Sequence, residues 1–281
     1  MKYQNKPIYF LLSVIIFSYS FLSTSVIAQE VEDEREFDYA RGGEKGPQRW
    51  GELKKEWAAC KNGEMQSPID LSDQRVRIIP KLGKVTRSYR TSNATLKNRG
   101  HDISLQWDIG KAGSIKINGT EYFLQQCHWH SPSEHTINGR RYDMEMHMVH
   151  ISTDEKVKNK IAVVGVLYKL GRPDSLLSKL MRHIAAMADN EEEKHLGMTD
   201  PTKIKLRSKK YYRYMGSLTV PPCTEGVIWT ISKKLRTVSR EQVKQLRVSV
   251  HDYAEENARP VQPLNRRGVH LIDGLNTQDR N

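Results

Sequence analysis

The sequence predicts a mainly β (α+β) protein of one domain, built on a large, mostly antiparallel sheet with short peripheral helices. Three observations support this prediction. Strand-like runs outnumber helical ones, no repeat or proline-rich linker divides residues 37–270, and 281 residues are enough to bury one large core. The expected strands are 75–79, 103–107, 114–117, 121–130, 144–151, 161–170 and 227–231.

Local signals indicate the turns and the helices. Asn118-Gly119 lies between two of these strands and is a strong signal for a two-residue β-hairpin. Apolar residues recur at helical spacing in 176–184, which predicts an amphipathic helix. Ser239 and Gln242 have the spacing of a capping box, so a second short helix is expected there.

The first 28 residues have the features of a secretory signal peptide. Lys2 and Lys6 form a basic n-region, residues 8–17 form an apolar h-region, and residues 26–28 provide a cleavage site. The alternative is an uncleaved anchor, because residues 8–27 are almost long enough to span a bilayer. Serines near the end of the segment favour cleavage, and we expect no stable membrane insertion of the mature chain.

The chain is basic, with a formal net charge of +12. This falls to +10 after cleavage, because residues 1–28 contain Lys2 and Lys6 and no acidic residue. The basic residues are scattered through mixed segments such as 75–90 and 203–216, and no nucleic-acid-binding motif occurs. We therefore expect no nucleic-acid partner, and we attribute the charge to a solvated face or to attraction to an acidic matrix such as a cell wall.

Three cysteines occur, and in an oxidising compartment two of them are expected to pair. Cys60 and Cys223 lie in polar, loop-like segments, whereas Cys127 lies in an apolar strand, where a lone thiol is usually buried. A Cys60–Cys223 bond would close a long loop and contribute on the order of 4–5 kcal/mol in the chain-entropy model. Asn93 and Asn118 begin Asn-X-Thr sequons, so both are expected glycosylation sites.

Strand alternation brings three histidines together. Gln126, His128 and His130 share one face of the strand 121–130, and Glu145 and His147 share one face of 144–151. Three neutral imidazoles with one open position are how proteins hold catalytic zinc. The sequence therefore predicts a metal site formed by the three histidines of these two faces.

The turn between the two strands suggests their register. Asn138-Gly139 is typical of a two-residue hairpin, which would place His130 directly opposite His147. Pro132 interrupts the ladder, so this register is a hypothesis about an irregular connection.

Two polar side chains are placed to orient the ligands. A metal-bound histidine usually donates its other N–H to a fixed acceptor, and Gln126 and Glu145 each lie two residues before a predicted ligand. A His-X-His pair alone more often marks a polar sheet face, but the matching alternation of His147, Gln126 and Glu145 favours a metal site. The remaining histidines that we expect to have no part in this site are His150, His183, His195, His251 and His270.

Two other metal folds share part of this pattern. In a cupin, Glu134 would be a ligand and a later G-x5-P-x-G-x2-H segment would be needed, but the sequence does not contain one. The H-x-H-x-D-H motif of metallo-lactamases fails as well, because no aspartate follows Ser131-Pro132. Neither alternative fits.

The sequence resembles the alpha-class carbonic anhydrases, in particular the secreted plant members, from about Phe37 to Leu271. The resemblance implies a ten-stranded, mainly antiparallel twisted sheet with zinc at the base of a conical cavity. It also implies that His128, His130 and His147 bind the zinc ion and that Cys60 pairs with Cys223. The motifs that carry it are GEMQSPIDL (63–71), NRGHDI (98–103), QCHWHSPSEHTING (126–139), MEMHMVH (144–150), SLTVPPCTEGVIW (217–229) and NARPVQPLN (257–265).

The resemblance also implies a mechanism, the attack of zinc-bound hydroxide on carbon dioxide. Thr219 would accept a hydrogen bond from the hydroxide and donate its own proton to Glu134, and His101 would shuttle the released proton near neutral pH. The residues implied to line the substrate pocket are Thr219, Val220, Val149, Val163, Leu218 and Trp229.

One position departs from the family pattern. Most relatives have a second threonine where this chain has Val220. Loss of that hydroxyl should rearrange ordered water near the metal and reduce the activity without abolishing it.

The expected organisation is a signal peptide (1–28), an acidic segment (29–36), the alpha-carbonic anhydrase domain (37–271) and a C-terminal tail (272–281). The resemblance implies a carbonate dehydratase, a zinc lyase acting on carbon dioxide and bicarbonate, as a monomer or weak dimer. The alternative function is a secreted binding or storage protein on the same fold with weak or no catalysis. The expected location is extracellular or apoplastic, with the chloroplast stroma, reached through the secretory route, as the alternative.

Overall fold

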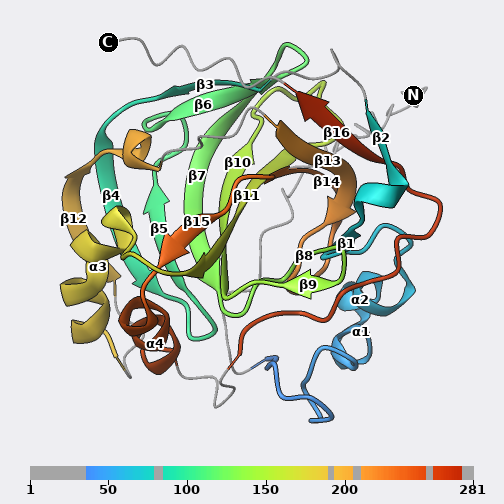
Figure 1. The fold of residues 1–281 in the computed structure, drawn as a ribbon, viewed down its shortest axis with the longest axis horizontal. Helices are drawn as coiled ribbons and strands as arrows, with labels where there is room; N and C mark the ends of the chain where they lie inside the picture. Colours follow the sequence, from blue (N-terminus) through green and yellow to red (C-terminus); the bar gives the residue numbers. More distant parts are fainter. Residues whose placement is uncertain (1–35, 79–84, 189–192, 205–209, 251–255, 274–281) are drawn as a thin grey trace, which may run out of the picture.

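The computed structural model describes residues 36–78, 85–188, 193–204, 210–250 and 256–273 (Figure 1). The expected signal peptide, His251, Ile79 and most of the C-terminal tail lie outside these ranges. The strands are β1 (Asp70–Leu71), β2 (Val76–Ile78), β3 (Val85–Tyr89), β4 (Ser92–Asn98), β5 (Ile103–Trp107), β6 (Gly113–Ile117), β7 (Thr120–His130), β8 (Thr136–Ile137), β9 (Arg140–Arg141), β10 (Met144–Ile151), β11 (Ile161–Leu170), β12 (Glu193–Thr199), β13 (Lys210–Ser217), β14 (Glu225–Ser232), β15 (Arg236–Val238) and β16 (Val269–Asp273). The α-helices are α1 (Trp50–Leu53), α2 (Ala59–Asn62), α3 (Ser175–Ala186) and α4 (Arg240–Val248), and short 3-10 turns occur at Lys55–Trp57, Asp73–Arg75 and Pro201–Lys203.

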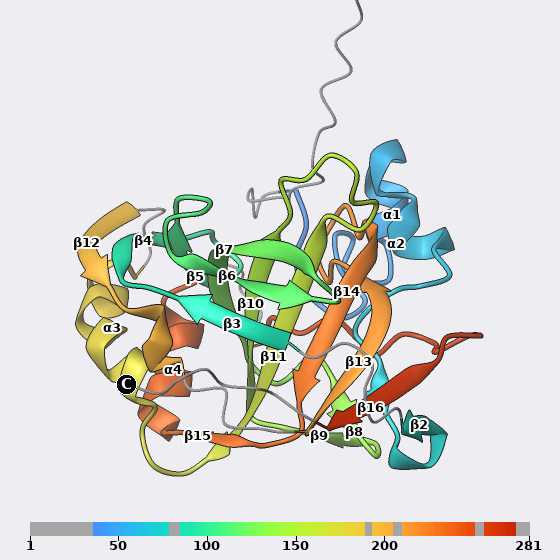
Figure 2. The same ribbon diagram turned by 90° about the horizontal axis from the view of Figure 1, so that it is seen from above.

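Ten strands form one continuous path, in the order β12-β4-β5-β7-β10-β11-β14-β13-β16-β2, and β3, β6 and β15 pair beside it. Most neighbours are antiparallel, while β14 and β15 run parallel to β11 and β2 runs parallel to β16. The predicted large and mainly antiparallel sheet is confirmed. Figures 1 and 2 show α3 and α4 on one side of the central strands β7, β10 and β11, and α1 and α2 on the other.

The expected strands and hairpin occur where the sequence placed them. The predicted ranges 103–107, 144–151 and 161–170 coincide with β5, β10 and β11. Ile117 pairs with Thr120, so Asn118 and Gly119 form a two-residue hairpin. Both have positive φ, 51° and 84°, a conformation that asparagine and glycine adopt more readily than other residues.

Alternation along β7 and β10 separates the core from the histidines. Cys127, Trp129 and Met146 point into the larger hydrophobic cluster on one side of the sheet, with Met144 and Met148. Side chains on the opposite face, including Val149, belong to a second cluster with residues of β11 and β14. Both faces of these central strands are therefore buried, and the histidines lie on the face that carries the second cluster.

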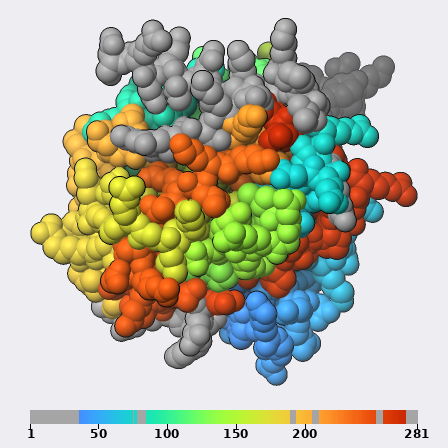
Figure 3. Space-filling view, viewed as in Figure 1, coloured from blue at the N-terminus to red at the C-terminus, as the bar shows by residue number. Residues whose placement is uncertain are grey.

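The two longer helices begin at defined caps. The Asp174 carboxylate accepts hydrogen bonds from the first backbone N–H groups of α3, and Ser239 with Gln242 forms the predicted capping box of α4. Gln242 also joins the helices, because its side chain bonds both the N–H and the C=O of Asp174. Figure 3 shows the surfaces of α3 (yellow) and α4 (orange-red) side by side.

The expected register between β7 and β10 is wrong by two residues. His147 lies opposite His128, and His130 lies opposite Glu145. The turn at Asn138-Gly139 does form, with Ile137 opposite Arg140. However, the two connections differ in length: residues 131–135 separate His130 from β8, whereas only residues 142–144 separate β9 from Glu145. The connection from β7 to β8 therefore contains two extra residues, which shifts the register. β8 has left the main sheet to pair with β1, which removes the constraint of a continuous ladder.

A disulfide joins Cys60 in α2 to Cys223, as predicted, and Cys127 is a buried free thiol. The bond lies in a cluster of aromatic side chains that includes Phe37 and Trp50. It connects the N-terminal helices to the segment between β13 and β14. Within the described ranges, no helix has the length and apolar composition needed to cross a membrane.

Candidate metal centre

Three buried imidazoles from two adjacent strands converge on one point. His128 and His130 come from β7 and His147 from β10. One ring nitrogen of each lies within 4.8 Å of the others, and the ring centroids are 4.6–5.2 Å apart. This arrangement can hold one metal ion, with the strand period of two placing His128 and His130 on the same face.

Each imidazole has one nitrogen committed to an acceptor. His128 Nδ1 donates to Gln126 Oε1 at 2.8 Å, and His147 Nε2 donates to Glu145 Oε1 at 2.8 Å. His130 Nδ1 donates to the backbone oxygen of Asn257 at 2.7 Å. The acceptors fix the tautomers, so the unprotonated nitrogens available to a metal are Nε2 of His128, Nε2 of His130 and Nδ1 of His147.

Buried atoms without partners point to a cation. Among the described residues, His130 Nε2 and Glu134 Oε2 have no hydrogen-bond partner, and they lie 3.7 Å apart. Glu134 Oε2 is also 3.9 Å from His147 Nδ1. A carboxylate oxygen and unprotonated ring nitrogens that are buried together fit a divalent metal with its bound water.

Two of the three converging histidines differ in their electrostatics. Burial lowers the pKa of His128 well below its ordinary value, which keeps this ring neutral and able to bind metal. Burial also acts to lower the pKa of His130, but the Glu134 and Asp102 carboxylates outweigh it and raise the pKa. A proton and a metal ion therefore compete for His130, so metal binding should weaken in acid.

Glu145 belongs to a buried network that the sequence analysis did not include. Its Oε1 also accepts from His135 Nδ1 at 2.7 Å, and its Oε2 accepts from the backbone N–H of His135 at 2.8 Å. His135 Nε2 in turn lies 2.6 Å from the Tyr214 hydroxyl, which contacts Ser67 Oγ at 2.8 Å. Burial acts to raise the pKa of Glu145, but His135 and His147 outweigh it and hold the pKa well below the usual range. His135 lies in the same histidine-rich segment as the ligands, and that clustering is the one signal that could have identified it.

Glu134 is buried and anchored from the far end of the chain. Its Oε1 accepts the backbone N–H of Arg259 at 2.9 Å. The Arg259 guanidinium is buried and donates to Gln66 Oε1 and to the Cys60 backbone oxygen. Thr219 is buried too, but no hydrogen bond joins it to Glu134 in the described part of the chain.

Four of the six residues expected to line the substrate pocket lie in one cluster. Val149, Val163, Leu218 and Trp229 pack together, and the Trp229 ring lies 4.8 Å from the His147 ring. Val220 belongs to the separate cluster around the disulfide. Apolar side chains thus border the metal-binding face on the side of His147.

His101 is completely buried. Its ring lies 5.0 Å from the Phe37 ring, and its Nε2 lies 3.7 Å from Asp102 Oδ2. Asn257, whose backbone oxygen orients His130, donates from its side chain to the backbone oxygen of His101 at 2.9 Å. Asn257 therefore links the position of His101 to that of His130, one of the three converging histidines.

The other predicted positions lie away from this centre. Asn93 in β4 and Asn118 in the β6–β7 turn are both exposed. His150 is buried on the opposite face of β10, where its Nε2 lies 2.6 Å from the Tyr89 hydroxyl. His183, His195 and His270 belong to none of the groups that could hold a metal ion in the described part of the chain.

Comparison with known proteins places this fold and centre in one class. The family model of the eukaryotic-type carbonic anhydrases matches residues 45–272. Alpha carbonic anhydrase 7 of Arabidopsis thaliana is 59% identical over 266 residues, which cover 94% of this chain and 95% of that protein.

Two solved structures have the same fold. Dioscorin complexed with ascorbate has 45% identity and a TM-score of 0.80, covering 86% of this chain and all of the other. A hyperthermostable carbonic anhydrase from a hydrothermal vent chimney has 35% identity and a TM-score of 0.75, covering 84% of this chain and all of the other. The chain belongs to the eukaryotic-type, or alpha, carbonic anhydrase family.

Proposed function

We propose that this chain is a zinc-dependent carbonic anhydrase, which reversibly converts carbon dioxide and water into bicarbonate and a proton. The observation that carries the proposal is a set of three buried imidazoles. One nitrogen of each ring donates a hydrogen bond to a fixed acceptor, and the other nitrogens converge on one point. This donor set suits catalytic zinc, which takes three protein ligands and keeps one position open.

A zinc ion held by these residues would supply Lewis-acid chemistry, which in carbonic anhydrases as a class lowers the pKa of bound water to about 7. The chain contributes neutral, fixed ligands. Gln126 and Glu145 hold His128 and His147 through short hydrogen bonds, and the backbone oxygen of Asn257 holds His130. Their roles are to orient the imidazoles and to prevent rotation that would break the site.

Glu134 and Thr219 are proposed to orient the attacking oxygen. Glu134 is fixed by the Arg259 N–H through one oxygen, and its other oxygen is an acceptor without a partner among the described residues. A Thr219 hydroxyl that donates to this acceptor must use its own lone pairs to accept. Thr219 therefore selects a nucleophile that can donate a hydrogen bond and aligns it for attack.

Carbon dioxide has no net charge and no hydrogen to donate, so an apolar surface suits it. Val149, Val163, Leu218 and Trp229 provide such a surface beside His147. We propose that carbon dioxide rests against these side chains, while Thr219 and Val220 border the site from the β13–β14 connection.

His101 is proposed to carry the released proton to solvent. Histidine is the side chain whose unperturbed pKa suits proton transfer near neutral pH. The His101 ring is buried against Phe37, so proton release requires the ring, or Phe37 beside it, to move and admit water.

The remaining expectations concern the context of the enzyme. We propose that residues 1–28 direct the chain into the secretory pathway, with Asn93 and Asn118 as glycosylation sites exposed to the modifying enzyme. An extracellular or apoplastic location fits the disulfide, and the chloroplast stroma is the alternative. We propose a monomer or weak dimer.

A second candidate function is a binding protein with weak catalysis. The specific observations that favour it are Val220 and the similarity to dioscorin. Removing zinc with a chelator and restoring it separates the candidates. The enzyme should lose carbon dioxide hydration with the metal and regain it at one zinc ion per chain, whereas stoichiometric zinc without turnover would support the binding protein.

A further inference from the structure

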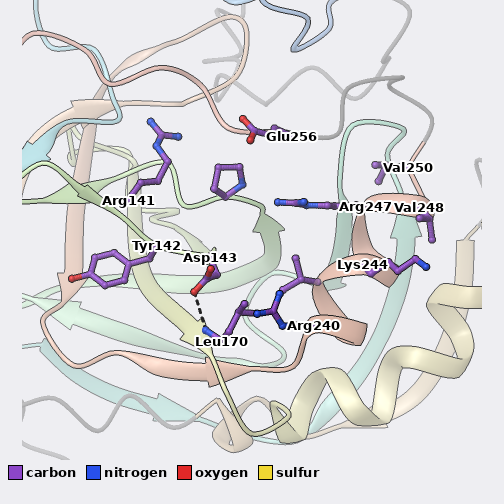
Figure 4. Close-up of a pocket in the computed structure, with 12 residues that line it drawn as sticks. Arg141, Tyr142, Asp143, Leu170, Arg240, Lys244, Arg247, Val248, Val250 and Glu256 are labelled. Carbon is purple, nitrogen blue, oxygen red and sulfur yellow. Dashed lines mark hydrogen bonds between the residues drawn. The ribbon is translucent and has the colours of Figure 1, made fainter.

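A cavity of about 820 Å³ lies outside the metal centre, between α4 and the connection from β7 to β10 (Figure 4). One wall consists of α4 residues, including Arg240, Lys244 and Arg247, and the other includes Arg141 and Tyr142. None of the three converging histidines lines it. Its volume falls in the range of small-molecule sites, about 300–1,000 Å³.

Positive charge dominates the described part of the lining. Among the described lining residues, Arg141, Arg240, Lys244 and Arg247 oppose two carboxylates, Asp143 and Glu256, which gives a net charge of +2. Both acids have other partners: Asp143 Oδ2 accepts the N–H of Leu170 at 2.8 Å, and Glu256 lies 3.5 Å from Arg41. In the described part of the chain, no carboxylate forms an ion pair with any of the four cations.

Two of the arginines are held in place by one nitrogen each. Arg247 Nε donates to Ser131 Oγ at 3.1 Å, and Arg141 Nη1 donates to the Ser133 backbone oxygen at 2.9 Å. Their other N–H groups remain available, and Figure 4 shows Arg247 extended toward the middle of the cavity. A guanidinium that is already oriented loses less entropy when its remaining N–H groups bind an oxyanion.

The rest of the lining is apolar. Val243 and Val248 of α4 and Leu170 at the end of β11 border the cavity, together with the Tyr142 ring. These side chains suit a compact carbon skeleton, while the cations around them suit charged groups at its edges. A single carboxylate would leave half of this net positive charge unmatched.

We propose that this cavity binds a small organic anion with two or more carboxylate or phosphate groups on a compact skeleton. In this site the remaining N–H groups of Arg141 and Arg247 donate hydrogen bonds to the oxyanions. Arg240 and Lys244 add positive charge from the first turns of α4. Its occupant is distinct from the carbon dioxide and bicarbonate of the metal centre.

Isothermal titration calorimetry on the purified, zinc-loaded protein tests the proposal at constant ionic strength. The probes are benzene-1,3,5-tricarboxylate, fructose 1,6-bisphosphate and, as the singly charged control, benzoate. We expect one site per chain for at least one multivalent probe, with an affinity at least about tenfold above that of benzoate and a decrease as salt rises. The tricarboxylate arm and the bisphosphate arm show which oxyanion the site prefers, and preference for either supports the proposal.

A matched pair of variants locates the binding. Arg240→Gln/Lys244→Gln should weaken the multivalent anion about tenfold. Lys179→Gln/Arg182→Gln removes the same charge from exposed positions of α3 and should leave the affinity unchanged. Multivalent probes no tighter than benzoate, an unchanged affinity in the α4 variant, or an equal loss in the α3 variant would each overturn the proposal. Because the readout is binding and not turnover, its failure is distinguishable from failure of the proposed enzymatic function.

Discussion

Each metal-facing imidazole depends on one hydrogen-bond acceptor, and the three acceptors differ in how far they lie along the chain. Gln126 and Glu145 are two residues from the histidines that they hold, on the same strand faces. Asn257 holds His130 through a backbone oxygen, 127 residues away in sequence. The first two are set by local strand geometry, whereas the third depends on how the C-terminal segment packs.

Val220 directly follows Thr219 in the connection between β13 and β14, and its side chain cannot form the hydrogen bond that a threonine could. It is buried with the disulfide and the aromatic rings around Phe37. We predict that Val220→Thr raises the rate of carbon dioxide hydration about two- to tenfold, the span of one added hydrogen bond worth about 0.5–1.5 kcal/mol. The measurement is stopped-flow hydration, with Val269→Thr as a control in a buried position of β16. An unchanged rate in Val220→Thr would show that this hydroxyl is not needed.

His150 gives the fold a pH dependence that is separate from the metal. Burial lowers its pKa to about 4, although its hydrogen bonds to the backbone act in the opposite direction. In the unfolded chain its pKa is near 6.5, so below that pH the unfolded state takes up a proton that the folded state does not. The stability of the wild type is therefore lost as the pH falls from about 6.5 toward 4.

The variant His150→Gln removes this titration and keeps a side chain that can form hydrogen bonds. We predict that between pH 7 and pH 4.5 the wild type loses about 2–3 kcal/mol more unfolding free energy than the variant does. Urea unfolding at the two pH values measures it, and His183→Gln on α3 is the control. Parallel pH profiles for the wild type and His150→Gln would contradict the prediction.

The limits of sequence-based prediction at this scale follow from distance along the chain. Gln126, Glu145 and the three ligands were predictable, because alternation along two strands places them on shared faces. His135 and Asn257 were not, because one lies in an irregular connection and the other acts through its backbone. Arg259, which holds Glu134, lies 125 residues beyond it.

At the scale of elements, periodicity located the central strands of the sheet but not its edge strands or the register across the β7–β10 connection. β5, β10 and β11 matched their predicted ranges because buried strands are long apolar runs. β4 and β12 were missed because both contain many polar residues and few apolar ones, and β12 is mostly exposed at the edge of the sheet. The predicted β7–β10 register was wrong because β8 pairs with β1, which lies 66 residues earlier in the chain.

The two longer helices are joined at their N-termini by one glutamine. Gln242 bonds Asp174 and Ser178 near the start of α3 as well as its own cap at Ser239. We predict that Gln242→Ala lowers the free energy of unfolding by about 2–3 kcal/mol, because it leaves buried backbone groups without partners. Gln245→Ala, which removes one half-buried hydrogen bond, should cost less than about 1 kcal/mol. Equal losses in urea unfolding would show that the link between the helices contributes little.

At the scale of the whole molecule, the disulfide fixes the N-terminal helices to the segment that carries Thr219 and Val220. Cys60 and Cys223 are 163 residues apart, so the bond restricts much of the unfolded chain. We predict that Cys60→Ala/Cys223→Ala lowers the free energy of unfolding by about 2–5 kcal/mol. Adding reductant during urea unfolding should destabilise the wild type by a similar amount and leave the variant unchanged. A wild type insensitive to reductant would contradict this prediction.

The overall architecture was predictable in class and less so in detail. Composition and strand periodicity indicated one large sheet with few helices, and the structure agrees. The parallel pairs of β11 with β14 and of β16 with β2 were not predictable from local patterns, because they join segments that are far apart in sequence. The cavity beside α4 likewise arises from tertiary packing and has no local sequence signal.

The central claim is that His128, His130 and His147 hold a zinc ion that is required for carbon dioxide hydration. The most direct test is stopped-flow hydration by the purified protein of known zinc content, beside His128→Ala. We predict one zinc ion per chain and rapid hydration in the wild type, with zinc affinity and turnover both lost in the variant. Turnover that persists in zinc-free His128→Ala, or stoichiometric zinc in the wild type without turnover above background, would contradict the claim.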